Sequence, residues 1–245
     1  MLVRAHALSW IARWDAQQEF YVPHRETLFG VIADAVAEVT GKPDPLVLDL
    51  GCGPGSLSVR LRERIPGARV VGVDSNSLLL ALAQTAHADT PGLRFVSADL
   101  GSPNWSDRLD LDTPVDAAIS TTALHWLTEP KLRATYATVH ALLTPGGILL
   151  DGDHLLVTDT APTLARVQRH LARPTQTPRD DWEQWWDAIA QDPDFGPLVT
   201  PRTGHNSHDE SQALATHHAA LTAAGFTEID TLWQHGDSRV LAAIR

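Results

Sequence analysis

The sequence has a single cysteine, Cys52, among its 245 residues, so no disulfide can form within the chain. It has no run of lysine or arginine, and its 30 acidic residues outnumber its 19 basic ones, giving a formal net charge of −11. Because this charge repels a phosphate backbone, we expect no nucleic-acid partner.

Long apolar segments are also absent. A membrane-spanning helix needs about 20 consecutive apolar residues, and no stretch of this sequence approaches that length. Arg4, Arg13 and Asp15 interrupt the N-terminal segment, which therefore lacks the apolar region of a secretory signal. We expect a cytoplasmic protein with no membrane partner.

The chain does have the alternating pattern of an α/β domain, which we expect to span residues 1–245. Short apolar runs typical of buried strands alternate with segments of helical periodicity. The predicted strands are 47–50, 69–74, 93–99, 115–120 and 148–150, and the predicted helices between them are 56–65, 77–87 and one that begins near 128–130. Such alternation predicts a doubly wound parallel sheet.

The C-terminal pattern differs from the rest. Two predicted strands, 226–233 and 238–244, are joined by only four residues. A link this short makes a hairpin, so the last strand is expected to run antiparallel to its neighbour.

Two segments lie outside this alternation. Residues 1–45 are predicted to form two helices whose aromatic residues, such as Trp10, Trp14 and Tyr21, either pack on the main domain or form a lid over a pocket. The insertion 153–210 is too long for an ordinary connection and is predicted to form a cap.

The stretch 45–56 organises the domain. A buried strand ending at Leu50 is followed by glycines at alternate positions, Gly51, Gly53 and Gly55, and then by a helix N-terminus. This arrangement predicts a pocket for a nucleotide-type cofactor. The third glycine stands one place too early for a dinucleotide fingerprint, because the sixth position of that pattern is Ser56.

Three acids end predicted strands at equal intervals: Asp49, Asp74 and Asp99. The carboxyl ends of parallel strands meet at one crevice, so we expect these acids to converge there. Asp74 fits the acid that bonds ribose hydroxyls, and Asp99 could accept a hydrogen bond from adenine. The acidic side chain of Asp49 disfavours a pyrophosphate and favours a cationic ligand such as S-adenosylmethionine. In the alternative interpretation, all three aspartates only cap turns.

Four segments of the sequence resemble the class I S-adenosylmethionine-dependent methyltransferases: 47–55, 71–74, 97–100 and 143–147. The resemblance implies a seven-stranded, mostly parallel sheet with an antiparallel last strand. It also implies that Gly51, Gly53 and Gly55 line the methionine end of S-adenosylmethionine and that Asp74 holds its ribose. By the same resemblance, Asp99 and Leu100 flank adenine, with Ser75 beside it.

The family places the residues that face the donor methyl after the fourth strand, here 120–127, and we assign Thr121 among them to the cofactor site. The His-Trp pattern at 125–126 is similar to the branch of the family that methylates small molecules and includes trans-aconitate methyltransferase. A small-molecule acceptor is therefore expected, with an oxygen or a nitrogen as the methylated atom.

His125 and His154 each follow the end of a strand, and histidine titrates near neutral pH, as a general base requires. We predict them as the catalytic residues. The alternatives are that His125 only packs or bonds a backbone carbonyl, or that transfer proceeds without a base because alignment supplies much of the rate.

The insertion carries two further candidate groups. Trp182, Trp185, Trp186 and Ile189 share one helix face, which either packs on the domain or forms an aromatic wall for a planar acceptor. The second candidate group comprises His205, His208, Asp209, His217 and His218, with Asp153 or His154. The polarity of a surface loop explains most of these histidines better than a metal site does, so no metal is predicted.

Two other functions share some of these features. A nicotinamide-dependent oxidoreductase would need a pyrophosphate at the glycine loop, which Asp49 and Ser56 disfavour. A non-catalytic module that only binds S-adenosylmethionine would share every cofactor residue and would differ in lacking an open acceptor pocket.

Overall fold

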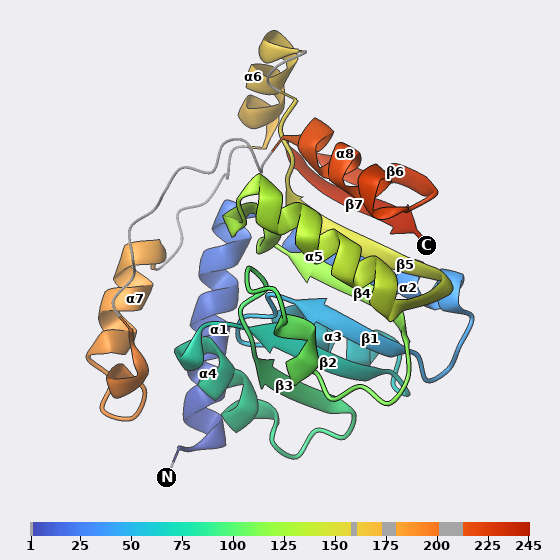
Figure 1. Ribbon diagram of the computed structural model, residues 1–245. Coiled ribbons are helices and arrows are strands. Elements are labelled where there is room, and N and C mark those ends of the chain that lie inside the picture. Colours follow the sequence, from blue (N-terminus) through green and yellow to red (C-terminus); the bar gives the residue numbers. More distant parts are fainter. Residues whose placement is uncertain (1, 158–160, 173–179, 201–212) are drawn as a thin grey trace.

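The computed structural model describes residues 2–157, 161–172, 180–200 and 213–245. Within them, one sheet has the strand order β3-β2-β1-β4-β5-β7-β6 (Figure 1). Its strands are β1 (Leu46–Leu50), β2 (Arg69–Asp74), β3 (Leu93–Ser97), β4 (Val115–Thr121), β5 (Leu143–His154), β6 (Glu228–His235) and β7 (Ser238–Ile244).

The helices fall close to the predicted segments. They are α1 (Arg4–Tyr21), α2 (Arg25–Thr40), α3 (Ser56–Arg64), α4 (Ser77–His87), α5 (Glu129–Leu142), α6 (Pro162–Leu171), α7 (Trp182–Ala190) and α8 (Leu214–Ala224). Three short 3-10 helices are η1 (Trp105–Arg108), η2 (Leu124–Trp126) and η3 (Gly196–Leu198). In the part of the chain that is described, no helix is both long enough and apolar enough to cross a bilayer.

The pairing of the strands confirms the predicted sheet. Strands β1 to β5 pair in parallel, and β7 pairs antiparallel with both β5 and β6. The strand order reverses where β1 lies beside β4. In an open α/β sheet, ligands bind at the carboxyl ends of the strands around such a reversal. The glycine loop after β1 lies at this point.

Two hydrophobic cores cover the two faces of the sheet. On one face α2 and α3 pack on the central strands, with side chains such as Phe29, Ile32 and Leu61 fully or almost fully buried. On the other face α5 and α8 pack with Tyr136, Val139 and others (Figure 1). This arrangement buries the central strands on both faces, as their continuous apolar runs require.

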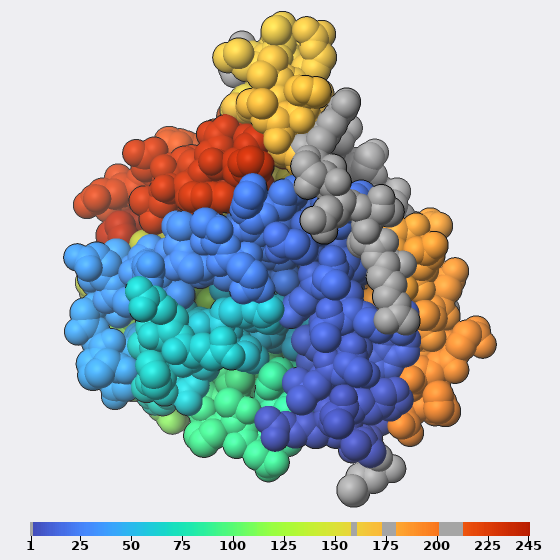
Figure 2. Space-filling view, turned by 180° about the vertical axis from the view of Figure 1, so that it is seen from behind, coloured from blue at the N-terminus to red at the C-terminus, as the bar shows by residue number. Residues whose placement is uncertain are grey.

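A third core joins α1, α4 and α7 beside the sheet. Figure 2 shows α1 and α7 side by side at one flank of the molecule. The tryptophan rings of the two helices meet edge to face, with centroids 5.0 Å apart for Trp14 and Trp185 and 5.8 Å for Trp10 and Trp185. The described residues of the insertion 153–210 are not one unit, because α6 lies near the β6–β7 hairpin while α7 lies against α1 (Figure 1).

The side chain that caps α4 is that of Asn76, which accepts a hydrogen bond from the Leu79 N–H. Tyr21, in the last turn of α1, is 40% exposed and lines the cavity described below.

Candidate functional site

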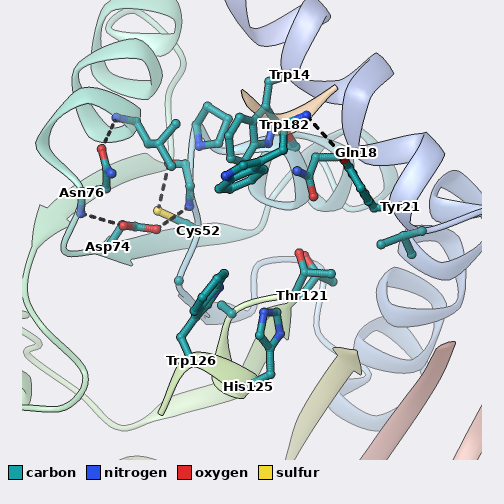
Figure 3. A pocket seen from close by; sticks show the side chains of 18 of the residues that line it. Trp14, Gln18, Tyr21, Cys52, Asp74, Asn76, Thr121, His125, Trp126 and Trp182 are labelled. Carbon is teal, nitrogen blue, oxygen red and sulfur yellow. Dashed lines mark hydrogen bonds between the residues drawn. The ribbon is translucent and has the colours of Figure 1, made fainter. Parts of the chain in front are cut away.

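A cavity of about 1090 Å³ opens at the carboxyl ends of β1 and β4 (Figure 3). Such a volume is at the upper end of the range for small-molecule sites. The glycine loop, the end of β2, the segment after β4, α1 and the start of α7 all line it. Of the predicted site residues, Gly51, Gly53, Asp74, Ser75, Thr121, His125 and His154 line this cavity.

The glycine loop needs its glycines for two physical reasons. Gly51 and Gly55 have φ of 68° and 87°, in the left-handed region that favours glycine. A Cβ at Gly51 would lie 2.2 Å from the Cβ of Ala123, and one at Gly55 would lie 2.9 Å from the Phe95 ring. The loop therefore passes close to the segment after β4, and any side chain at Gly51 would push the two apart.

Asp74 ends β2 at the wall of the cavity. Its two carboxylate oxygens accept hydrogen bonds from the backbone N–H groups of Gly53 and Asn76, both at 2.8 Å. Burial raises the pKa of Asp74, although these backbone hydrogen bonds oppose that effect. The same carboxylate thus holds the glycine loop in place and offers its remaining lone pairs to a ligand.

Asp49 does not lie at the cavity wall. Its side chain is 1% exposed within β1, and the Ser58 hydroxyl of α3 donates a hydrogen bond to it at 2.5 Å. Burial raises the pKa of Asp49 to about 7. This carboxyl faces α3 and joins that helix to the sheet. Because it is partly neutral at pH 7 and lies away from the cavity, the structure does not support the predicted attraction of a cationic ligand by Asp49.

Asp99 and Leu100 do not line the cavity either. β3 ends at Ser97, and Asp99 is exposed in the turn that follows, where it accepts hydrogen bonds from the Gly101 N–H and the Ser102 hydroxyl. Leu100 packs partly buried against the core beneath α5. The predicted ring of three acids is wrong, because Asp74 alone of the three reaches the cavity.

His125 lies in η2, just after β4, with its ring at the cavity (Figure 3). The Nδ1 atom is 2.8 and 2.9 Å from the two carboxylate oxygens of Asp153 on the neighbouring strand β5. A carboxylate can only accept, so Nδ1 carries the proton and Nε2 is the basic ring nitrogen.

The charges of this pair shift both pKa values. Burial opposes ionisation of each group, but the mutual attraction and hydrogen bonds outweigh it. The net effect raises the pKa of His125 and lowers that of Asp153 to about 2. A histidine whose tautomer and orientation are set by a buried carboxylate is the arrangement that general bases use.

His154 lies at the end of β5 and also lines the cavity. Its Nδ1 is 3.3 Å from a carboxylate oxygen of Asp237 in the β6–β7 hairpin, and it also interacts with the backbone of Tyr21. Burial lowers the pKa of His154, but these partners and the charge of Asp153 raise it overall. Through these two contacts His154 joins α1 to the hairpin.

Aromatic side chains make up part of the cavity wall, here called the aromatic wall. Trp14 and Tyr21 of α1 and Trp182 of α7 line it on one side, and Trp126 lies on the opposite side beside His125 (Figure 3). Trp186 of α7 also lines the cavity and contacts Trp14. The centroids of the Trp14 and Trp182 rings are 5.4 Å apart.

Charged side chains anchor α1 to the glycine loop. One carboxylate oxygen of Asp15 accepts from Arg25 at 2.9 Å and from the Ser56 hydroxyl at 2.5 Å, and the other lies 2.9 Å from Arg60. Arg25 is 6% exposed and lies over the Phe29 ring. Ser56 opens α3, so this network links three helices at the edge of the cavity.

Sequence reasoning missed Asp153 and Asp15 as site residues. Asp153 was considered only as a metal ligand, yet it comes shortly after the predicted strand 148–150 and lies near the carboxyl end of β5, where the other strand-end acids were sought. The signal for Asp15 was weaker, because a polar residue between Trp14 and Gln18 reads as the exposed side of an amphipathic helix.

Of the histidines considered as metal ligands, the structure describes three, which lie in two elements: His154 at the end of β5, and His217 and His218 in α8. His217 is fully buried in α8, where its Nδ1 is 2.7 Å from the Tyr136 hydroxyl and 3.2 Å from Asp151, so its interpretation as a polar loop residue was wrong. His218 is exposed on the same helix, whereas His205, His208 and Asp209 lie outside the described residues.

Comparisons with known proteins agree with this geometry. A family described as "Methyltransferase domain" matches residues 47–147. A trans-aconitate 2-methyltransferase from Azoarcus sp. (strain BH72) is 35% identical over 136 residues, which are 56% of this chain and 49% of that protein. The chain spans about half the length of the curated relatives it matches.

Solved structures share the fold at low identity. Human N-acetylserotonin methyltransferase in complex with SAM aligns with a TM-score of 0.55 at 17% identity, covering 89% of this chain and 51% of that one. An O-methyltransferase family protein from Burkholderia thailandensis aligns with a TM-score of 0.57 at 17% identity, covering 87% and 55%. The sheet order and these matches show that the chain shares the fold of S-adenosylmethionine-dependent methyltransferases and that its residues 47–147 are similar to a methyltransferase domain.

Proposed function

We propose that this protein transfers a methyl group from S-adenosylmethionine to a hydroxyl oxygen of a small-molecule acceptor. The observation that carries the proposal is the His125–Asp153 pair, whose histidine lines the same cavity as the glycine loop and Asp74. A cofactor cradle and an oriented base in one cavity supply both things that an O-methyl transfer needs.

The residues at the glycine loop fit S-adenosylmethionine. Asp74 has acceptor capacity for ribose hydroxyls, and the N-terminus of α3 suits the methionine carboxylate. Gly51, Gly53 and Ser75 line the same part of the cavity. When bound, S-adenosylmethionine supplies an electrophilic methyl group on a sulfonium; the residues of this chain hold the cofactor, orient the acceptor and accept its proton.

His125 is assigned the role of general base. Its Nε2 takes the hydroxyl proton as the acceptor oxygen forms its bond to the methyl carbon, and Asp153 stabilises the imidazolium that results. The aromatic wall keeps water from the acceptor, and alignment in the cavity supplies much of the remaining rate. Thr121 ends β4 and lines the cavity, and we assign it to the cofactor site.

The curated relatives support a small molecule as the acceptor, because the name trans-aconitate 2-methyltransferase refers to one. An acceptor nitrogen is the alternative, since an amine also needs to lose a proton. A purely cofactor-binding protein would have the same glycine loop, but its function would not require a histidine such as His125 to be oriented by a buried carboxylate.

Turnover of methyl-labelled S-adenosylmethionine with a metabolite extract tests this proposal. We expect label in a small-molecule product, identified by mass spectrometry, together with S-adenosylhomocysteine. His125→Gln should lower kcat about 100-fold or more while leaving cofactor affinity within threefold.

Two results would count against the proposal in different ways. Cofactor binding by calorimetry with no S-adenosylhomocysteine from any extract would indicate a non-catalytic binding module. Fluorescence of a bound nicotinamide cofactor, without binding of S-adenosylmethionine, would indicate an oxidoreductase instead.

A further inference from the structure

The positive groups at the cavity already have negative partners within the chain. Among its described lining residues, Arg25 is the one arginine or lysine, and it is paired with Asp15 at 2.9 Å. The two histidines are likewise held by carboxylates, His125 by Asp153 and His154 by Asp237. A polycarboxylate acceptor would need positive groups with no such partner, which these residues do not provide.

Two carboxylates add to this effect at the mouth of the cavity. Asp181 and Glu183, at the start of α7, are exposed and line it beside Trp182. Their charges repel an anionic acceptor on its approach, and the chain as a whole carries a formal net charge of −11.

The apolar surface of the same region is aromatic. Trp14 and Trp182 meet on one side, and Trp126, which is 46% exposed, lies on the other side next to His125 (Figure 3). A tryptophan ring at the cavity exposes apolar surface to water, and a planar ligand that stacks on the ring removes that surface from water, which favours binding. The centroids of the His125 and Trp126 rings are 5.0 Å apart, so a ring stacked on Trp126 lies within reach of the base.

We infer that the acceptor is an uncharged, planar aromatic alcohol, such as a phenol or a naphthol, held between the tryptophans of α1 and α7 and Trp126. This inference rests on the proposed function and departs from the tricarboxylate for which the curated relatives are named. The aryl hydroxyl oxygen forms the new bond to the methyl carbon as the carbon–sulfur bond breaks. The hydroxyl proton passes to His125 Nε2, leaving an aryl methyl ether and S-adenosylhomocysteine.

Three probes that differ in shape and charge test the inference. 2-Naphthol is planar and neutral, decahydro-2-naphthol has the same carbon skeleton without planarity, and trans-aconitate is a planar trianion. Their binding is measured by calorimetry with the full chain saturated with S-adenosylhomocysteine. We expect 2-naphthol to bind at least tenfold more tightly than either of the other two.

Two matched variants locate the binding site. Trp126→Leu removes an exposed ring at the cavity, and Trp233→Leu removes a partly buried ring on β6 away from it. Trp126→Leu is expected to weaken 2-naphthol binding about tenfold with S-adenosylhomocysteine affinity unchanged, whereas Trp233→Leu leaves both unchanged. Equal binding of decahydro-2-naphthol, tighter binding of trans-aconitate, or no effect of Trp126→Leu would overturn the inference.

The same measurements separate this inference from the proposed function. Absence of S-adenosylhomocysteine binding contradicts the proposed function and with it this inference. Binding of S-adenosylhomocysteine without 2-naphthol overturns only the choice of acceptor. A further assay replaces S-adenosylhomocysteine with S-adenosylmethionine, and tight 2-naphthol binding without formation of its methyl ether would overturn the inference that an aryl hydroxyl is the acceptor.

Discussion

Asp74 and Asp99 both end predicted strands, 69–74 and 93–99, yet Asp74 is the last residue of β2 whereas Asp99 lies two residues beyond the end of β3. Asp74 lines the cavity and accepts from two backbone N–H groups, whereas Asp99 is exposed and closes its own turn. Two residues of one type and similar spacing therefore give a matched test of the cofactor site.

Asp74→Asn is predicted to weaken S-adenosylmethionine binding at least tenfold, which corresponds to about 1.4 kcal/mol. The amide loses the charge that is proposed to hold the ribose hydroxyls, and it places an N–H₂ group where the N–H of Gly53 or Asn76 donates. Calorimetry measures the affinity, and Asp99→Asn is the control expected to bind like the wild type. Equal losses in the two variants would contradict the assignment of Asp74.

The His125–Asp153 pair predicts how stability depends on pH. The pKa of His125 is raised in the folded state, so its protonation favours folding. That contribution is fully present below the unfolded pKa of about 6.5 and is lost as pH rises through the folded pKa. His125→Gln should therefore destabilise the protein most at pH 5 to 6, by on the order of 1–3 kcal/mol, and less at pH 9.

Urea unfolding of the wild type and His125→Gln at several pH values measures this difference. The lowered pKa of Asp153, about 2, adds a separate contribution that is present above about pH 4 and is lost as pH falls toward 2. A difference between the two proteins that stays constant from pH 5 to 9 would contradict the charged pair.

At the scale of the elements, the sheet was predictable because its strands are short apolar runs bounded by turn residues. The strand 69–74, the helix 77–87 and the last strand 238–244 have the predicted bounds. The site was predictable only where a backbone feature determines it, as at the glycine loop. Side chains whose direction depends on a turn, such as Asp99, or on a distant partner, such as Asp49 with Ser58, were not.

Pairs between separate elements were also out of reach of the sequence. His125 and Asp153 lie 28 positions apart and meet because β4 and β5 are neighbours in parallel register, Thr121 being opposite Gly152. His217 of α8 reaches Asp151 only because α8 packs beside α5. No local periodicity reports either pairing.

The network that anchors α1 gives a prediction at this scale. Asp15→Ala leaves Arg25 buried without its carboxylate, and removing one partner of a buried pair typically costs about 3–5 kcal/mol. It also releases Ser56 at the start of α3, so S-adenosylmethionine affinity should fall as well.

Chemical denaturation measures the loss of stability, with Asp34→Ala as the matched control. Asp34 pairs with Arg64 on the surface, where both side chains are exposed, and its removal is expected to leave the free energy of unfolding unchanged. An Asp15→Ala variant as stable as Asp34→Ala would show that Arg25 finds another partner.

The whole molecule consists of a sheet with a core on each face and a third core at its flank. The first two cores share the strands, whereas the third joins α1, α4 and α7 without any strand residue. The glycine loop belongs to the sheet, and most of the aromatic wall belongs to the third core. Under the proposed function, the cofactor site therefore rests mostly on the sheet and the acceptor site mostly on the third core, and the contact between Asp15 and Ser56 joins the two.

Trp185 tests this division, because it is fully buried in the third core and is not among the residues that line the cavity. Trp185→Ala removes contacts of α7 with Trp10 and Trp14, and truncating a buried tryptophan typically costs about 3–5 kcal/mol. We expect faster hydrogen exchange in α7 and unchanged exchange in β1, β4 and β5. The affinity for 2-naphthol should fall at least tenfold, whereas the affinity for S-adenosylmethionine should stay within threefold of the wild-type value.

Trp105→Ala is the matched control, because Trp105 is buried to the same degree in the core on the sheet. Its loss should speed exchange in the central strands and lower the stability of the whole domain, since those strands connect both faces. If Trp185→Ala speeds exchange in β1 and β4 as much as Trp105→Ala does, the flank and the sheet unfold together. The affinities for 2-naphthol and S-adenosylmethionine would then fall together.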